Sequence, residues 1–203
     1  VAKAEVEAIN PDIRAVAHAL YLDRNNGLSL LAGSDLIVNG VDDPYAMVVL
    51  HRVAKELGKP ALFLLSGSLP LHRVCSVITP GESVDFETFM GLPTKGRSLE
   101  PEEEVRALLH GVVSRARIRS GLGRGAFPGD WSEDPSGRVP KPSNVMSSSI
   151  VSFAGVLEAV KVLIDRPNLR PVMAPSLIYY DGAGSCMSVR TPELGKTWFQ
   201  GDF

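Results

Sequence analysis

The feature that most constrains this fold is a strand–helix–strand unit between residues 33 and 80. An apolar run at 36–38 leads to Pro44, after which apolar residues recur at helical spacing: Ala46, Val49, Leu50, Val53, Ala54 and Leu57. A second apolar run follows at 61–65. A crossover of this length predicts parallel strands, and continuous apolar runs are typical of parallel strands covered on both faces. The unit predicts an α/β fold, a mostly parallel sheet flanked by helices.

Four residues fall where a ligand is expected, beyond the carboxyl ends of the two strands. Asp42 and Asp43 follow the first strand, and Ser66 and Gly67 follow the second. Asp42 is interpreted either as a metal or nucleotide ligand or as the N-cap of the helix beginning at Pro44, and for Asp43 the cap is favoured. Ser66 and Gly67 are either ligand-side residues or a strand end with a tight turn.

The remaining sequence predicts a single domain over 1–203 with three further parts. The amino-terminal part contains a helix at 2–9, an alternating strand at 13–20 and a short helix at 28–32. After a strand at 72–79, residues 81–143 form a crossover or insertion with one helix, at 98–117. Residues 144–190 supply a helix at 148–164 and a hairpin around 182–184.

Composition excludes several classes of function. The chain has 203 residues and a net charge of -2, which gives no electrostatic case for nucleic acid or an anionic membrane surface. Its apolar runs are shorter than the roughly 20 residues that a bilayer helix needs, so a cytoplasmic protein is expected. The two cysteines, Cys75 and Cys186, form no CxxC pair, and the four histidines do not occur at ligand spacing, so no zinc is expected.

A set of motifs in a fixed order resembles the second half of the ThiF/MoeB/HesA family, the adenylating enzymes related to ubiquitin-activating enzyme. The resemblance covers 1–80 and 142–190. It rests on the sequences INPDI at 9–13, DLIVNGVDD at 35–43, GKP at 58–60, SG at 66–67, VITP at 77–80, the helix at 148–164, and Tyr180-Asp181.

The resemblance implies ATP and magnesium as cofactors and adenylation of the carboxyl terminus of a small ubiquitin-like or sulfur-carrier protein. It implies that Asp42 is the catalytic, metal-binding and nucleotide-binding aspartate. Asp43, Ser66 and Gly67 are expected beside the nucleotide because they also lie beyond the carboxyl ends of the two strands. It also implies a homodimer. The family's glycine-rich phosphate loop, ribose-binding acid and ATP-contacting arginine and lysine would precede Val1, so the chain is expected to be a partial form lacking the first βαβ unit.

Several departures from the family pattern keep other functions open. Asp43 and Met47 stand where the family usually has Asn and Arg, the paired CxxC motifs are absent, and no cysteine occurs between Cys75 and Cys186. These departures favour a non-catalytic partner that keeps the fold and acts by binding. A nicotinamide-dependent dehydrogenase ranks last, because the glycine fingerprint and a catalytic Tyr-Lys or His pair are missing.

Overall fold

The computed structural model describes residues 1–66, 72–119, 145–181 and 184–192. Its strands form one five-stranded open sheet in the order β1-β2-β3-β4-β5. The strands are β1 (Ile37–Asn39), β2 (Ala61–Ser66), β3 (His72–Ile78), β4 (Leu177–Asp181) and β5 (Cys186–Arg190). The helices are α1 (Ala2–Ile9), α2 (Gly27–Leu31), α3 (Pro44–Glu56), α4 (Phe86–Met90), α5 (Glu102–Arg119) and α6 (Val145–Ile164). The predicted α/β class is confirmed.

The sequence predicted a mostly parallel sheet, but the sheet is mixed, with one parallel pair and three antiparallel pairs. β1 and β2 are parallel, as the helical crossover between them predicts, with Ile37 opposite Ala61. β3 is antiparallel to β2 and to β4, and β4 is antiparallel to β5. The five residues that separate β2 from β3 are too few for a crossover, so β3 must return beside β2 in the opposite direction. The predicted hairpin of β4 and β5 is confirmed.

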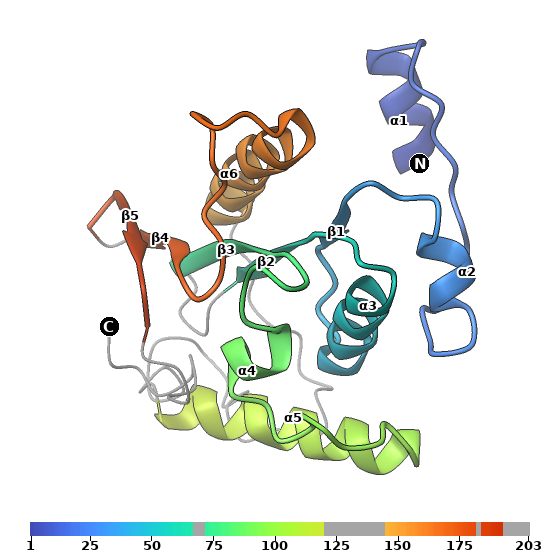
Figure 1. Ribbon diagram of the computed structural model, residues 1–203, viewed down its shortest axis with the longest axis vertical. Helices are drawn as coiled ribbons and strands as arrows, with labels where there is room; N and C mark the ends of the chain where they lie inside the picture. The colour runs from blue at the N-terminus through green and yellow to red at the C-terminus, as the bar shows by residue number, and fades with distance from the viewer. Residues whose placement is uncertain (67–71, 120–144, 182–183, 193–203) are drawn as a thin grey trace.

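Helices cover the two faces of the sheet (Figure 1). α6 lies on one face, in contact with β2, β3 and β4, while α3 and α4 lie on the other with α5 outside them. Alternate residues of a strand therefore enter different cores: Phe63 packs in the large cluster with α3, α4 and α5, and Leu64 packs against α6. α6 approaches the sheet closely at Gly155, where a Cβ atom would come within 2.6 Å of Leu64 Cδ2.

Two predictions about secondary structure were wrong. Residues 13–20 alternate in polarity but belong to no strand, and their apolar side chains, such as Val16 and Leu20, are exposed. Alternation is insufficient because a strand needs a hydrogen-bonded neighbour, and in the described structure this segment has none. One helix was predicted within 81–143, but the described part of this range, 81–119, contains two, since α4 precedes α5. α4 begins where Asp85 accepts a hydrogen bond from the Thr88 backbone N–H, and it ends at Gly91 with φ 61°.

The amino-terminal helix α1 stands apart from the sheet (Figure 1), and none of its residues is buried against the rest of the described chain. An extended segment connects it to α2, which packs on α3. Within the described residues, no helix is long and apolar enough to cross a bilayer.

Candidate functional site

The candidate site lies where β1 passes into α3. Residues 36–41 carry the chain from the half-buried strand β1 to an exposed loop. Pro44 begins the helix at a position where its missing N–H is not needed. Asp43 is the N-cap, because its Oδ1 accepts a hydrogen bond from the Tyr45 backbone N–H at 3.1 Å. The structure thus assigns to Asp43 the capping role that the sequence favoured for it.

Asp42 lies beside the cap but faces solvent. Its side chain is exposed, and it has no hydrogen-bond or ion-pair partner among the described residues. A carboxylate oxygen is the hard ligand that Mg²⁺ prefers, and Mg²⁺ typically uses one or two carboxylates together with substrate phosphates and water. Asp42 therefore fits a magnesium–nucleotide ligand by its chemistry. Among the described residues there is no group of three or more His, Cys, Asp or Glu side chains that could hold a metal ion.

The second half of the predicted site consists of Ser66 and Gly67, and the structure describes only the first of them. Ser66 is the last residue of β2 and pairs with Arg73 of β3. Because Asn39, the last residue of β1, is opposite Phe63, β2 extends three residues further than β1 before it reaches Ser66. Gly67 lies outside the described residues. The structure thus places Asp42 and Ser66 at the same edge of the sheet.

Arg106 of α5 reaches this edge from the far side of α3. Its Nη1 donates to Asp43 Oδ2 at 2.5 Å, and its Nε donates to Glu102 at 2.7 Å. The guanidinium also lies over two aromatic rings, 4.3 Å from the centroid of Tyr45 and 5.0 Å from that of Tyr21. Tyr21 itself donates a hydrogen bond to Asp43 Oδ2. Asp43 therefore joins the cap of α3, the helix α5 and the amino-terminal segment.

The hydrogen bonds of this cluster set its charge state. Burial raises the pKa of the Asp43 carboxyl, but the hydrogen bonds from Tyr21 and Arg106 are stronger together and hold it below its ordinary value. Burial opposes the charge of Arg106, yet its bonds to Asp43 and Glu102 raise its pKa. Burial and the Asp43 carboxylate raise the pKa of Tyr21, so it stays a neutral donor. The arginine charge is thus already neutralised by two carboxylates.

Sequence reasoning missed Arg106, Tyr21 and His110, whose Nε2 lies 3.9 Å from Asp43 Oδ1. The helical spacing of Glu102 and Arg106 predicts an ion pair within α5, but the 63-residue separation of Arg106 from Asp43 leaves no local signal. It also missed Asn39, which is 0 % exposed and whose Nδ2 has no acceptor in the described chain. A buried donor without an acceptor costs about 1–3 kcal/mol, which favours a further acceptor at this edge.

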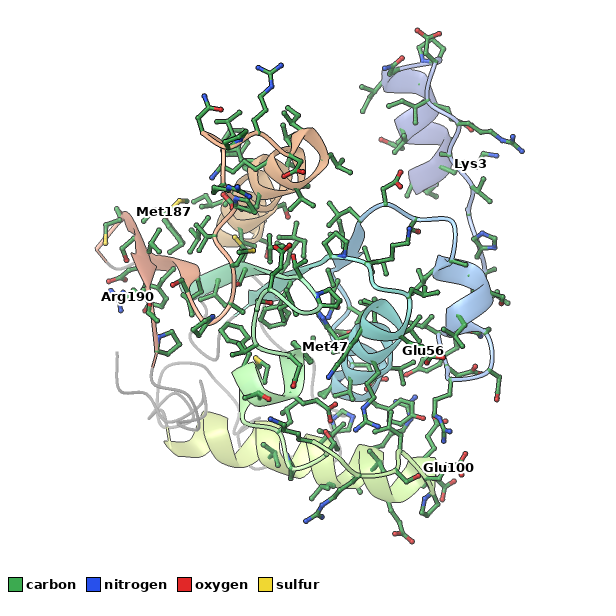
Figure 2. The ribbon with its side chains drawn as sticks, viewed as in Figure 1. Lys3, Met47, Glu56, Glu100, Met187 and Arg190 are labelled. Carbon is green, nitrogen blue, oxygen red and sulfur yellow. The ribbon has the colours of Figure 1, made fainter. Side chains whose placement is uncertain are left out.

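Met47 belongs to α3 and is buried at 8 % exposure in the large core, and Figure 2 shows it inside the molecule. The sequence placed Met47 where the ThiF/MoeB/HesA pattern usually has an arginine. An apolar, buried side chain cannot supply a cation there.

Comparison with known proteins gives one family and several similar folds. The model of the ThiF family matches residues 1–196. No curated protein matches the chain significantly. Among solved structures, E. coli MccB with MccA-N7isoASN has a TM-score of 0.60 at 12% identity, covering 98% of this chain and 50% of that chain. E. coli MccB with ATP has a TM-score of 0.59 at 12% identity, covering 96% and 47%. A selenomethionine structure of PaaA has a TM-score of 0.56 at 16% identity, covering 94% and 53%.

At these identities the solved structures are evidence of a shared fold alone. The chain spans about half the length of each of these structural neighbours.

Proposed function

Because this chain belongs to the ThiF family, we propose that it forms part of an ATP-dependent adenylyltransferase. The substrate would be the carboxyl terminus of a small ubiquitin-like or sulfur-carrier protein, as the resemblance implies. The observation that carries the proposal is the exposed Asp42 carboxylate, unpaired in the described chain, at the carboxyl end of β1. The solved complex of MccB with ATP supports nucleotide binding by a fold of this kind.

In this proposal Asp42 holds magnesium, and Asp43 keeps Asp42 in place by fixing the start of α3. ATP with magnesium supplies an electrophilic α-phosphate that a carboxylate can attack with release of pyrophosphate. The loop at 40–43 would orient the magnesium-bound phosphates at the end of β1, where Asn39 Nδ2 also lies without an acceptor in the described chain. Arg106 contributes no free charge, because Asp43 and Glu102 already neutralise it.

The proposal also requires that the small carrier protein bind at the same site as ATP. MccB has been solved with AMPCPP and MccA together, which supports a fold of this kind holding a nucleotide and a further partner. Magnesium rests on the family resemblance, and the roles of Asp43, Ser66 and Gly67 beside the nucleotide rest on their position beyond the carboxyl ends of the strands.

The test is magnesium-dependent ATP binding and ATP–pyrophosphate exchange, with candidate carrier proteins, by this chain and by the longest natural form. Asp42→Asn should weaken magnesium-dependent ATP binding at least about tenfold, since it removes the carboxylate charge that Asp42 offers to the metal. Asp35→Asn is a matched control, because Asp35 is an exposed aspartate just before the opposite end of β1. Equal binding by the two variants would exclude Asp42 as the metal ligand.

A non-catalytic binding partner is the second candidate, favoured by the buried Met47 and by the engagement of Asp43 with Arg106. It predicts no exchange and no ATP binding by either form, with partner binding unchanged by Asp42→Lys.

The expected homodimer has a candidate surface on α6. The side of α6 turned away from the sheet exposes a continuous set of apolar residues: Phe153, Val156, Leu157, Val160, Leu163 and Ile164. Exposed apolar patches of this kind mark interaction sites, and a two-fold dimer needs a face that can pack on itself. Val160→Glu should convert a dimer to a monomer in analytical ultracentrifugation. A wild-type chain that sediments as a monomer would contradict the homodimer.

A further inference from the structure

A cavity of about 120 Å³ lies at the edge of the sheet opposite to Asp42. Ala61 and Ile78 line it, and these are the first residue of β2 and the last residue of β3. Since β1 and β2 are parallel, the start of β2 lies at the other edge from the end of β1. The cavity is therefore separate from the proposed nucleotide site and does not depend on it.

His51 lines this cavity from α3 and is 5 % exposed. Its ring stacks on Phe86, with 4.1 Å between the ring centroids and 8° between the planes. Neither Nδ1 nor Nε2 has a hydrogen-bond partner among the described residues. Burial lowers the pKa of His51 to about 3, so the imidazole is neutral near pH 7 and offers one donor and one acceptor. An unsatisfied buried ring favours a ligand with a polar group.

The charged residues that line the cavity are Lys55, Lys59 and Asp85, which leave one positive charge in excess. Asp85 Oδ2 lies 4.0 Å from Nζ of both Lys55 and Lys95, and Asp85 Oδ1 accepts from the Thr88 backbone N–H and side chain. Lys59 also lines the cavity, is half-buried, and has no partner in the described chain. Because Lys55 already balances Asp85, the charge of Lys59 is available to an anion.

The inner wall of the cavity is apolar. Ala54, Ala61, Ile78 and Phe86 line it and are each at most 7 % exposed. A cavity of about 150 Å³ holds one benzene molecule, so a slightly smaller one suits roughly five or six non-hydrogen atoms. A fully polar anion such as phosphate would leave these apolar side chains without contacts, whereas a short aliphatic chain would fill the space beside them.

We propose that this cavity binds a small organic carboxylate, with its anionic group at Lys59 and His51 and its aliphatic part against Ala54, Ala61 and Ile78. The carboxylate accepts from the lysine ammonium and from the imidazole N–H. The aliphatic part of the ligand covers the apolar side chains of the cavity wall and so removes them from contact with water. The site is distinct from adenylation, and its occupancy can be measured without ATP.

The test uses the whole 203-residue chain labelled with ¹⁵N-histidine and titrated with sodium butyrate at constant ionic strength near pH 7. The buried imidazole of His51, assigned by its loss in His51→Gln, should shift in a saturable manner at millimolar butyrate. Such weak binding is expected from so few ligand atoms. Inorganic phosphate and sodium chloride are the parallel titrations, and both should leave this resonance unmoved.

Two lysine variants give the decisive comparison. Lys59→Met keeps an unbranched side chain of nearly the same length and removes the charge, so butyrate affinity should fall about tenfold or more. Lys3→Met makes the same charge change on α1, far from the cavity (Figure 2), and should bind butyrate like the wild-type chain. No shift with butyrate, an equal shift with phosphate, or equal affinity in the two variants would overturn the proposal. A butyrate-specific shift that Lys59→Met weakens would establish it.

Discussion

Asp43 performs two tasks that a pair of substitutions can separate. Asp43→Asn keeps an N-cap of comparable quality but removes the negative charge, whereas Asp43→Ala removes both. The cap contributes about 1 kcal/mol. The bond to Arg106 joins two side chains with exposures of 23% and 20%, and hydrogen bonds to charged groups contribute about 1.5–3 kcal/mol. We therefore expect losses of about 1–2 kcal/mol for Asp43→Asn and about 2–3 kcal/mol for Asp43→Ala.

Urea unfolding measures both losses, because a change in midpoint at constant m-value reports stability alone. A double-mutant cycle with Arg106→Met should give a coupling energy of about 1 kcal/mol or more between Asp43 and Arg106. The pair Arg24–Glu100 is the control, since its side chains are 46% and 72% exposed and Glu100→Gln should cost under about 0.5 kcal/mol. If Asp43→Asn is as stable as the wild-type chain, the bond to Arg106 does not stabilise the fold.

The cluster also predicts a dependence of stability on pH. The pKa of Asp43 is held below its ordinary value in the folded chain, so its contribution is full above the unfolded pKa and is lost as pH falls through the folded one. Asp43→Asn should remove this part of the acid destabilisation. The same loss of stability on acidification in the variant and the wild type would contradict the assignment.

Three further predictions concern other parts of the fold. Arg52→Met should lower the free energy of unfolding by about 2–3 kcal/mol, because Arg52 donates two hydrogen bonds of 2.8 Å to Glu87 and one to each of two backbone carbonyls. A loss under about 0.5 kcal/mol in urea unfolding would contradict this prediction. His51 has a folded pKa of about 3 and an unfolded pKa near 6.5, so the unfolded state binds the extra proton and stability falls as pH drops between these values. His51→Phe should flatten that slope in urea titrations across this range, and an unchanged slope would refute the burial of a neutral ring. Burial raises the pKa of the Cys75 thiol to about 12, so iodoacetamide should label the exposed Cys186 much faster than Cys75 in the folded chain. Equal labelling rates by mass spectrometry would show that β3 is accessible to the reagent.

The sequence predicted those parts of the candidate site that depend on neighbouring residues. The strand at β1, the helix beginning at Pro44 and the cap at Asp43 were all confirmed, since strand ends, proline and capping act over a few positions. The family was also identified from the order and spacing of motifs, and the family model confirms it. Short α4 was missed because five residues hold too little periodicity, although the Asp85 cap was a usable signal.

Contacts between distant residues decided the rest. Alternation at 13–20 predicted a strand, but the ladder partner that makes a strand is absent from the described sheet, so the segment stays extended and exposed. The contacts of Arg106 with Asp43 and Tyr21 depend on how α5 packs across α3. The cavity at His51 depends on how α3, α4 and two strand ends pack together. Strand ends, caps and helix starts depend on consecutive residues, so the sequence determines them. These two sites form only when burial of apolar surface brings remote segments together.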